Sequence, residues 1–307
     1  MSGRIVVTGA GGQLGGRLAA HGTEQGRNVL ALTSAQWDIT DPAAAEAIVT
    51  SGDVVINCAA YTDVDGAESD QARAYAVNEA APAHIARACA RVGARLIHVS
   101  TDFVFAGDYA DPHPFEPSDE TTPRGVYACS KRAGEVAVLA ALPEAQCTVV
   151  RTAWVYTGGT GKDFVAIMRK LAAGGDAQGP VKVVDDQVGS PTYVGDVADA
   201  LLQIADDRVP GPILHAANEG AVSRFGLARA VFEECGADPE RVHPVSTAEF
   251  PRPAPRPTYS ALSSRESAAA GMTPLRPWRP ALVAALAAPA ASGGPAPAER
   301  PIISTRD

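Results

Sequence analysis

Long apolar runs are missing from this chain of 307 residues: no segment approaches the roughly 18 uninterrupted apolar residues that a membrane-spanning helix needs. The first residues, Met1–Arg4, lead directly into a strand-like segment without the apolar core of a secretion signal. Basic side chains are also few, since 26 Lys and Arg stand against 35 Asp and Glu and leave a net charge of −9. We therefore expect a cytoplasmic protein without a membrane or nucleic-acid partner.

Cysteine is scarce as well. The five cysteines are dispersed and form no Cys-x-x-Cys pair, which favours reduced thiols over a disulfide framework or a zinc site. The six histidines show no metal-ligand spacing either, and we predict no metal site. The cysteines are Cys58, Cys89, Cys129, Cys147 and Cys235.

Short β-branched segments alternate with longer Ala-rich segments along most of the chain. Strands such as Val54–Ile56 are wholly apolar, which is typical of a parallel sheet covered by helices on both faces. The alternation predicts an α/β fold with a doubly wound parallel sheet, the Rossmann fold, and a smaller C-terminal substrate-binding lobe. The expected strands are Arg4–Thr8, Asn28–Thr33, Asp53–Asn57, Ala94–Val99, Cys147–Arg151, Val181–Val184 and Ile213–His215.

We assign residues 1–155 to the dinucleotide-binding domain, with 181–216 returning to it, and residues 156–180 and 217–287 to the lobe. The segment 251–257 contains four prolines, which fix φ and remove backbone donors, so we expect a stiff surface crossing over the nucleotide. A docking peptide of the PxxP type is the alternative. Residues 288–307 have little to bury and are expected to be disordered.

A glycine-rich loop follows the first strand. Gly9, Gly12 and Gly15 stand at GxxGxxG spacing between this strand and an amphipathic helix. Gly9 permits the tight turn, Gly12 lets the backbone approach a pyrophosphate, and Gly15 lets the helix pack closely on the strand. The helix N-terminus adds amide donors and a partial positive charge, so the loop predicts a dinucleotide site.

The residues after the second strand bear on the choice between NAD and NADP. An acid about 20 positions after the loop would bind the ribose 2′-hydroxyl of NAD. The second strand instead ends in Thr33-Ser34, and the first acid is Asp38. Ser34 and Arg17 would tolerate a 2′-phosphate, so we expect NADPH, with NADH as the alternative.

Tyr127 and Lys131 form a Tyr-x-x-x-Lys pair, which a helix places on one face. A nearby ammonium favours the phenolate and makes a phenol a better acid–base group at neutral pH. Seven Tyr and four Lys would produce about 0.1 such pairs by chance, so coincidence is disfavoured. Upstream, the strand Ala94–Val99 runs into Ser100-Thr101-Asp102 at the sheet edge where ligands bind, and Thr101 can orient a substrate oxygen.

These motifs and several others resemble the extended short-chain dehydrogenase/reductases, and among them the dTDP-4-dehydrorhamnose reductase family in a form similar to its mycobacterial members. The resemblance covers nearly all of residues 4–287. Its most specific stretches are Arg-Thr-x-Trp-Val-Tyr at 151–156 and Asp-Gln-x-Gly-x-Pro-Thr at 186–192. The resemblance implies NAD(P)H-dependent reduction of the C4 ketone of dTDP-4-dehydro-L-rhamnose, a step in dTDP-rhamnose and cell-wall precursor biosynthesis.

The resemblance also implies roles for residues at matching positions. Tyr127, Lys131 and Thr101 would be catalytic, and Lys131 would also hold the nicotinamide ribose. The substrate-binding residues would be Thr101, Asp102, Tyr127 and Trp154. The cofactor-binding residues would be Gly9, Gly12, Gln13, Leu14, Gly15, Asp38, Ile39, Ala59, Ala60, Tyr61 and Lys131.

Several departures from the family pattern bear on these implied roles, among them Ala106, where Asp is common, and Cys129 between Tyr127 and Lys131. Phe103 stands where the family usually has Tyr, and Asp163 replaces a usual Asn, which leaves its nucleotide contact open. Some members dimerise through magnesium bound by glutamates, but Gly16 replaces the Glu, so we carry over no metal. The expected protein is a monomer or a homodimer.

Other functions remain as alternatives. A related dehydratase would need a second acid after Asp102, where Phe103 stands, and epimerases share the Tyr/Lys pair without the two specific stretches. A related 4-keto-6-deoxyhexose reductase of different stereochemistry would share all of these motifs. A non-catalytic NADP-binding regulatory subunit is the alternative from a different class, although it would not need Thr101, Tyr127 and Lys131 together.

Overall fold

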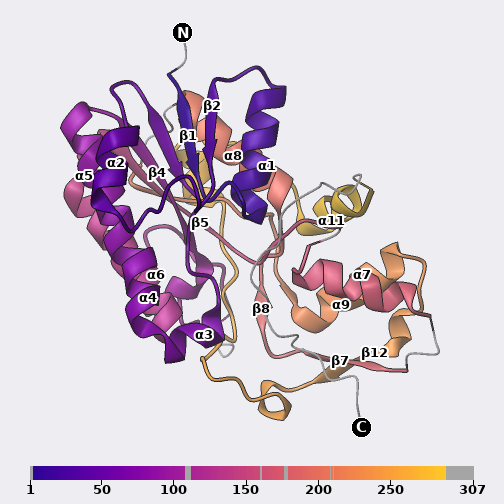
Figure 1. Cartoon of the computed structure of the whole chain (residues 1–307). Coiled ribbons are helices and arrows are strands. Elements are labelled where there is room, and N and C mark those ends of the chain that lie inside the picture. Colours follow the sequence, from indigo (N-terminus) through magenta and orange to yellow (C-terminus); the bar gives the residue numbers. More distant parts are fainter. Residues whose placement is uncertain are drawn as a thin grey trace.

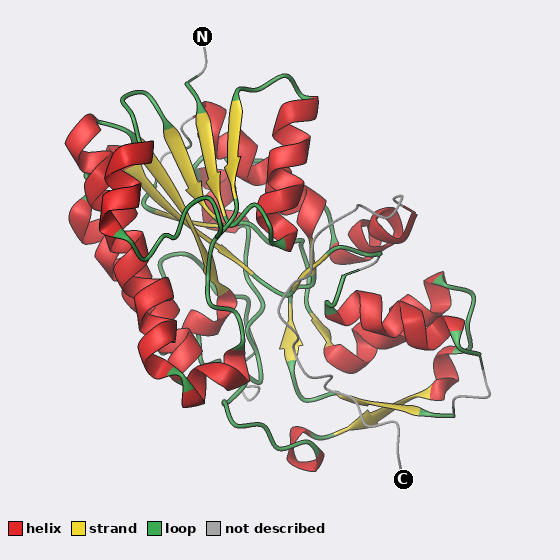
Figure 2. Cartoon of the chain, in the orientation of Figure 1, coloured by secondary structure: helices red, strands yellow, loops and turns green. Residues whose placement is uncertain are grey.

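The computed structural model describes residues 3–107, 112–159, 161–175, 179–207, 209 and 211–287. At its centre lies a six-stranded sheet in the order β10-β5-β4-β3-β1-β2, with every neighbouring pair parallel (Figures 1 and 2). The predicted doubly wound α/β fold is confirmed. The strands are β1 (Ile5–Thr8), β2 (Val29–Leu32), β3 (Val54–Asn57), β4 (Arg95–Thr101), β5 (Cys147–Thr152) and β10 (Ile213–His215).

Helices cover both faces of this sheet. Strand residues alternate between two hydrophobic cores: Val7 packs with α1 and α8, whereas Val6 packs with α2, α5 and α6. The helices are α1 (Gln13–Glu24), α8 (Val194–Asp207), α2 (Pro42–Ile48), α5 (Ala81–Val92) and α6 (Val126–Ala141). At the edge of this half lie α3 (Val64–Ser69), α4 (Gln71–Tyr75), the π-helical turn η1 (Ala76–Ala80) and α10 (Arg265–Ala269). No helix in the described ranges is long and apolar enough to cross a membrane.

The smaller lobe has its own core. The helices α7, α9 and α11 share this core, and α9 packs against a parallel pair of strands, β7 and β12 (Figure 1). Two further pairs join the lobe to the larger half, β8 with β11 and β6 with β9. The bounds are β7 (Val181–Val184), β12 (Val242–Val245), α7 (Phe164–Ala173), α9 (Arg224–Glu234), α11 (Trp278–Ala287), β8 (Val188–Gly189), β11 (Val222–Ser223), β6 (Val155–Tyr156) and β9 (Thr192–Tyr193). Short 3₁₀ turns are η2 (Asp102–Val104), η3 (Glu144–Gln146), η5 (Pro239–Arg241) and η6 (Thr247–Glu249).

The return of the chain to the central sheet differs from the expected boundary. Val181–Val184 forms a strand as expected, but it pairs with β12 in the lobe, and the chain rejoins the central sheet at β10. In this strand Lys182 is exposed between buried valines. This alternation is typical of a sheet with one face in solvent, whereas a strand of the central sheet is covered by helices on both faces. The expected disorder of residues 288–307 concerns residues outside the described ranges.

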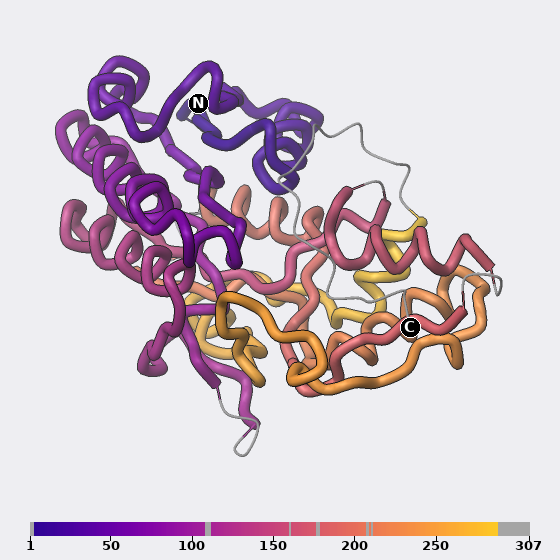
Figure 3. Tube along the Cα trace, turned by 60° about the horizontal axis from the view of Figure 1, so that its bottom comes forward, coloured from indigo at the N-terminus to yellow at the C-terminus, as the bar shows by residue number. Residues whose placement is uncertain are grey.

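The segment 251–257, which we call the Pro-Arg segment, contains neither helix nor strand, as its prolines predict. It leads from the lobe back to the larger half and passes beside α3 (Figure 3). The chain therefore crosses between the two halves here as well as after β5.

A buried ion pair holds α6 against the sheet. Glu135 accepts hydrogen bonds from Arg151 Nε at 3.0 Å and Arg151 Nη2 at 2.9 Å, and both side chains are at most 1% exposed. Arg132 Nη1 adds a third bond at 3.1 Å. Gly134 lies so close to η1 that a Cβ there would come within 2.0 Å of the Asn78 carbonyl oxygen. The helix is thus fixed on two sides.

Glu135→Ala is expected to destabilise the fold by about 3–5 kcal/mol, because it leaves the Arg151 guanidinium buried without its carboxylate. Urea unfolding followed by circular dichroism measures the change. The control is Glu46→Ala, which removes an exposed pair with Arg91 and should cost less than about 1 kcal/mol. Equal losses in the two variants would contradict a special role for the buried pair.

Candidate active site

A cavity of about 1080 Å³ opens at the carboxyl edge of the central sheet and extends toward the lobe. It includes the point between β1 and β3 where strand order reverses, which is where ligands bind in open α/β sheets. All the predicted site residues line this one cavity. They are Gly9, Gly12, Gln13, Leu14, Gly15, Asp38, Ile39, Ala59, Ala60, Tyr61, Thr101, Asp102, Tyr127, Lys131 and Trp154.

The glycine loop forms one wall. Gly9 has a φ of +65°, and a Cβ there would lie 2.8 Å from the Ala59 nitrogen. A Cβ on Gly15 would lie 2.3 Å from the Gly9 carbonyl oxygen. No side chain caps the N-terminus of α1, which begins directly after Gly12. The loop therefore combines a close backbone approach with a helix N-terminus, as a bound pyrophosphate requires.

Beyond the loop, the cavity is lined by Ser34, Asp38 and Ile39. Asp38 accepts hydrogen bonds from Thr40 Oγ1 at 2.7 Å and Thr40 N at 2.9 Å, and these lower the pKa of its carboxyl. Of the two residues suggested above for a 2′-phosphate, Ser34 lines the cavity and Arg17 does not. Arg73 on α4 also lines it. Sequence reasoning missed Arg73, because its position depends on how α4 packs.

Tyr127 and Lys131 lie one turn apart on α6, and both face the cavity. Lys131 is buried, and its Nζ donates a hydrogen bond to the Val99 carbonyl oxygen at 2.8 Å. Burial lowers the pKa of Lys131 to about 8, with Glu135 acting in the opposite direction. The Tyr127 ring packs edge-on against Phe103, with 5.7 Å between the centroids. The pair therefore places a phenol and an ammonium in the same wall.

Thr101 and Asp102 form a hydrogen-bonded group at the end of β4. Thr101 Oγ1 donates to Asp102 Oδ1 at 3.1 Å, and Ser260 Oγ donates to Asp102 Oδ2 at 2.6 Å. Burial raises the pKa of Asp102 to about 6, although both hydrogen bonds act to lower it. Sequence reasoning missed Ser260, which comes from the far end of the chain just after the Pro-Arg segment. A lone serine carries no signal of such a contact.

Trp154 is held from two sides. The Arg224 guanidinium lies 3.6 Å from the centroid of the indole, and a Cβ on Gly189 would come within 2.5 Å of the same ring. Trp154 has a φ of +45°, and it is the one non-glycine residue with positive φ in the described part of the chain. Such a conformation costs about 1–3 kcal/mol, and it persists here because the two neighbouring groups determine the ring position. The two specific sequence stretches therefore meet at this ring.

Asp163 links the lobe to the glycine loop. It caps α7 by accepting from Ala166 N, and its other carboxylate oxygen accepts from Thr157 Oγ1 at 2.7 Å and from Gln13 Nε2 at 3.3 Å. The residue lines the cavity, so the replacement of Asn by Asp keeps the capping function.

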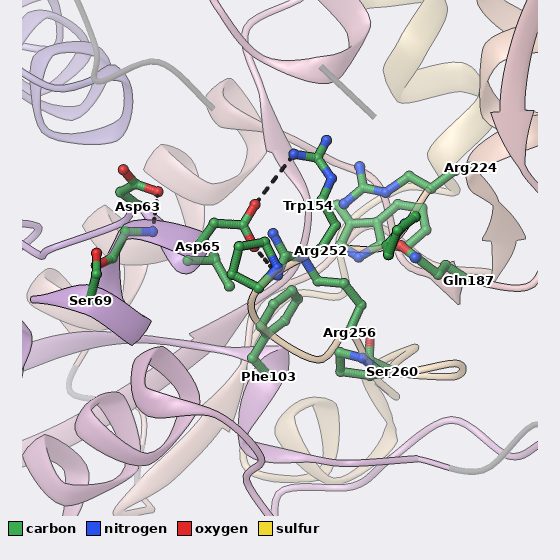
Figure 4. Close-up of a pocket in the computed structure, with 15 residues that line it drawn as sticks. Asp63, Asp65, Ser69, Phe103, Trp154, Gln187, Arg224, Arg252, Arg256 and Ser260 are labelled. Carbon is green, nitrogen blue, oxygen red and sulfur yellow. Dashed lines mark hydrogen bonds and ion pairs between the residues drawn. The ribbon is translucent and has the colours of Figure 1, made fainter. Parts of the chain in front are cut away.

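A second cavity of about 410 Å³ adjoins the first (Figure 4). Phe103, Trp154 and Arg224 line both of them. The second cavity also contains residues of α3 and of the Pro-Arg segment, including Asp65, Arg252 and Arg256. Among the described residues, no group of three or more His, Cys, Asp or Glu is arranged to hold a metal ion.

Comparison with known families matches residues 3–290 to the RmlD substrate binding domain. The chain belongs to this family. One RmlD relative, a dTDP-4-dehydrorhamnose reductase of Mycobacterium tuberculosis, is 71% identical over 306 residues, which cover 99% of this chain and 98% of the relative. Another of the same name from Mycolicibacterium smegmatis is 58% identical over 299 residues, with 97% and 90% covered.

A solved structure of another dTDP-4-dehydrorhamnose reductase has the same fold as this chain. The dTDP-4-dehydrorhamnose reductase of Bacillus anthracis in complex with NADP superposes with a TM-score of 0.84 at 33% identity, covering 92% of this chain and 98% of that chain. The RmlD family and its reductase members therefore match the whole arrangement, from the sheet to the lobe.

Asp102→Asn is expected to stabilise the fold by about 1–3 kcal/mol at pH 8, because a carboxyl whose pKa is raised from 3.8 to about 6 opposes folding once it is ionised. The gain should shrink as the pH falls from about 6 toward 4, because the native wild-type carboxyl takes up its proton in this range while the unfolded one, with a pKa of 3.8, stays mostly ionised until the pH nears that value. Urea unfolding at several pH values measures it. A variant that is less stable than the wild type at pH 8 would contradict this account.

Proposed function

We propose that the protein uses NADPH to reduce the C4 ketone of dTDP-4-dehydro-L-rhamnose and yields dTDP-L-rhamnose. The relatives at 71% and 58% identity are reductases of this name, and a structural neighbour contains NADP. The observation that carries the proposal is that Thr101, Tyr127 and Lys131 line the same cavity as the glycine loop. The reaction is a step of dTDP-rhamnose biosynthesis.

The cavity fits this cofactor. The glycine loop would hold the pyrophosphate, Asp38 and Ile39 would flank the adenine, and Lys131 would bind the nicotinamide ribose. Ala59, Ala60 and Tyr61 follow β3 and would line the nicotinamide half. NADPH supplies the hydride.

The chain supplies the proton and the orientation. Tyr127 donates its phenolic proton to the alkoxide that develops at C4, and the Lys131 ammonium favours the resulting phenolate. Thr101 orients the same oxygen by turning its hydroxyl proton away from Asp102 Oδ1. Asp102 and Trp154 contact the sugar and limit how it lies in the cavity.

Two alternatives fit the site less well. A dehydratase needs a second acid next to Asp102, and Phe103 instead packs its ring against Tyr127. A regulatory subunit that only binds NADP has no use for Tyr127 as an acid whose phenolate a neighbouring ammonium favours. A related reductase of different C4 stereochemistry would use the same residues, and the product separates it from the proposed one.

We propose that the protein acts in the cytoplasm as a monomer or a homodimer, without nucleic acid. Its acidic composition and the small-molecule nature of the substrate support this.

Tyr127→Phe is expected to lower kcat by about 10²–10⁴-fold, because the ring stays and only the proton donor is lost. NADPH affinity, followed by cofactor fluorescence, should stay within about twofold of the wild type. Tyr75→Phe, which changes a half-buried tyrosine outside both cavities, is the control and should keep full activity. Near-normal turnover in a folded Tyr127→Phe protein would remove Tyr127 from this role.

The activity itself is tested with NADPH and enzymatically prepared dTDP-4-dehydro-L-rhamnose. We expect NADPH oxidation and a product that co-elutes with dTDP-L-rhamnose. NADPH binding without oxidation would favour the regulatory subunit, and the C4 epimer would favour the related reductase.

A further inference from the structure

One carboxylate on α3, that of Asp65, binds the Pro-Arg segment at three points. Asp65 Oδ2 lies 3.3 Å from Arg252 Nη1, and Asp65 Oδ1 lies 3.0 Å from Arg256 Nη1 (Figure 4). The Ala254 backbone nitrogen donates to the same Asp65 Oδ1 at 3.3 Å. The three charged side chains are only 13–22% exposed, so they line the second cavity rather than extend into solvent.

The charge of this cavity stands out in a chain of net charge −9. Three arginines, Arg224, Arg252 and Arg256, face two carboxylates, Asp63 and Asp65. Asp63 is already used as the cap of α3, where it accepts from Gly66 N at 2.8 Å. The wall therefore carries a cationic excess of one, concentrated around guanidinium groups, and suits a small multiply charged anion.

The geometry of Arg256 leaves donors for such an anion. Its bonds to Asp65 and to the Ala254 carbonyl oxygen both leave from Nη1, and Nε and Nη2 take part in neither. A planar guanidinium held at one edge can donate two parallel bonds from the other edge, which matches the oxygens of a phosphate.

The second cavity also continues into the catalytic one. Phe103, Trp154 and Arg224 line both, and Ser260, three residues after the Pro-Arg segment, donates to Asp102. A sugar placed beside Tyr127 would therefore carry its attached phosphates into the second cavity. Asp65 therefore holds the Pro-Arg segment itself, and Ser260 joins the chain just after the segment to Asp102.

We propose that the second cavity binds the diphosphate of the nucleotide sugar, that Arg252 and Arg256 are its ligands, and that Asp65 is a positioning residue that holds both guanidiniums in place. This inference rests on the proposed function, since it concerns the same substrate. Without Asp65 the two arginines repel each other and must be ordered when the substrate binds, which costs side-chain entropy.

The first test compares dTDP with thymidine as competitive inhibitors. In Arg256→Ala and Arg252→Ala, dTDP should bind at least about tenfold more weakly, whereas inhibition by thymidine should stay unchanged because it carries no phosphate. Arg256→Lys should recover only part of the loss, since an ammonium cannot form two parallel bonds. Equal dTDP inhibition in the wild type and both alanine variants would overturn the assignment.

The second test addresses Asp65. In Asp65→Asn, we expect KM for the sugar nucleotide to rise severalfold while kcat and NADPH affinity stay near the wild type. Unchanged or tighter dTDP binding would overturn the positioning role, and so would an equal loss of dTDP and NADPH binding, which a general disturbance of the fold would produce. Glu240→Gln removes another carboxylate–arginine pair, with Arg229, and serves as the matched control.

A measurement of dTDP binding tests this inference independently of the proposed function. Direct titration of the wild type with dTDP needs no turnover. If dTDP binds through the two arginines but the 4-keto sugar is not reduced, the proposed function fails and the diphosphate site stands. If the sugar is reduced and the arginine variants bind dTDP normally, the diphosphate site fails alone.

Discussion

The structure depends most on how α6 is held against the central sheet. The buried Glu135–Arg151 ion pair ties the helix to β5, and the Lys131 bond to the Val99 carbonyl oxygen ties it to β4. Lys131 and Glu135 are four residues apart, so both anchors lie on one face of the helix. Tyr127 lies one turn before Lys131, and its position relative to Thr101 follows from these anchors.

A second constraint is the packing of the Trp154 ring against residues that are distant from it in the sequence. The residue follows β5, yet its ring is held by Arg224 of α9 and by Gly189 of β8, both in the part of the chain that builds the lobe. The positive φ of Trp154 is kept by this packing. The wall between the two cavities is thus made jointly by the dinucleotide-binding half and the lobe. In the proposed binding mode it would keep the reacting end of the sugar and its phosphates in separate but connected spaces.

Local patterns were enough to predict much of this arrangement. The apolar strands, the loop from Gly9 to Gly15 and the Tyr127/Lys131 pair each depend on short-range spacing, and the predicted site residues line one cavity. The roles of Ser260, Arg73 and Asp65 had no local signal, because each depends on tertiary packing; the contacts of Ser260 with Asp102 and of Asp65 with Arg252 span more than 150 residues. The strand Val181–Val184 was found, but its partner β12 lies about 60 residues later, and strand pairing at that distance is not encoded in one strand.

The central claim is that hydride reaches C4 of the sugar in the cavity where α6 presents Tyr127. NADPH carrying deuterium at the transferred C4 position of the nicotinamide tests this directly, with the product sugar read by NMR. We predict deuterium bonded to C4 of the rhamnosyl ring and nowhere else. Deuterium at another ring carbon, or a product without deuterium, would contradict the account.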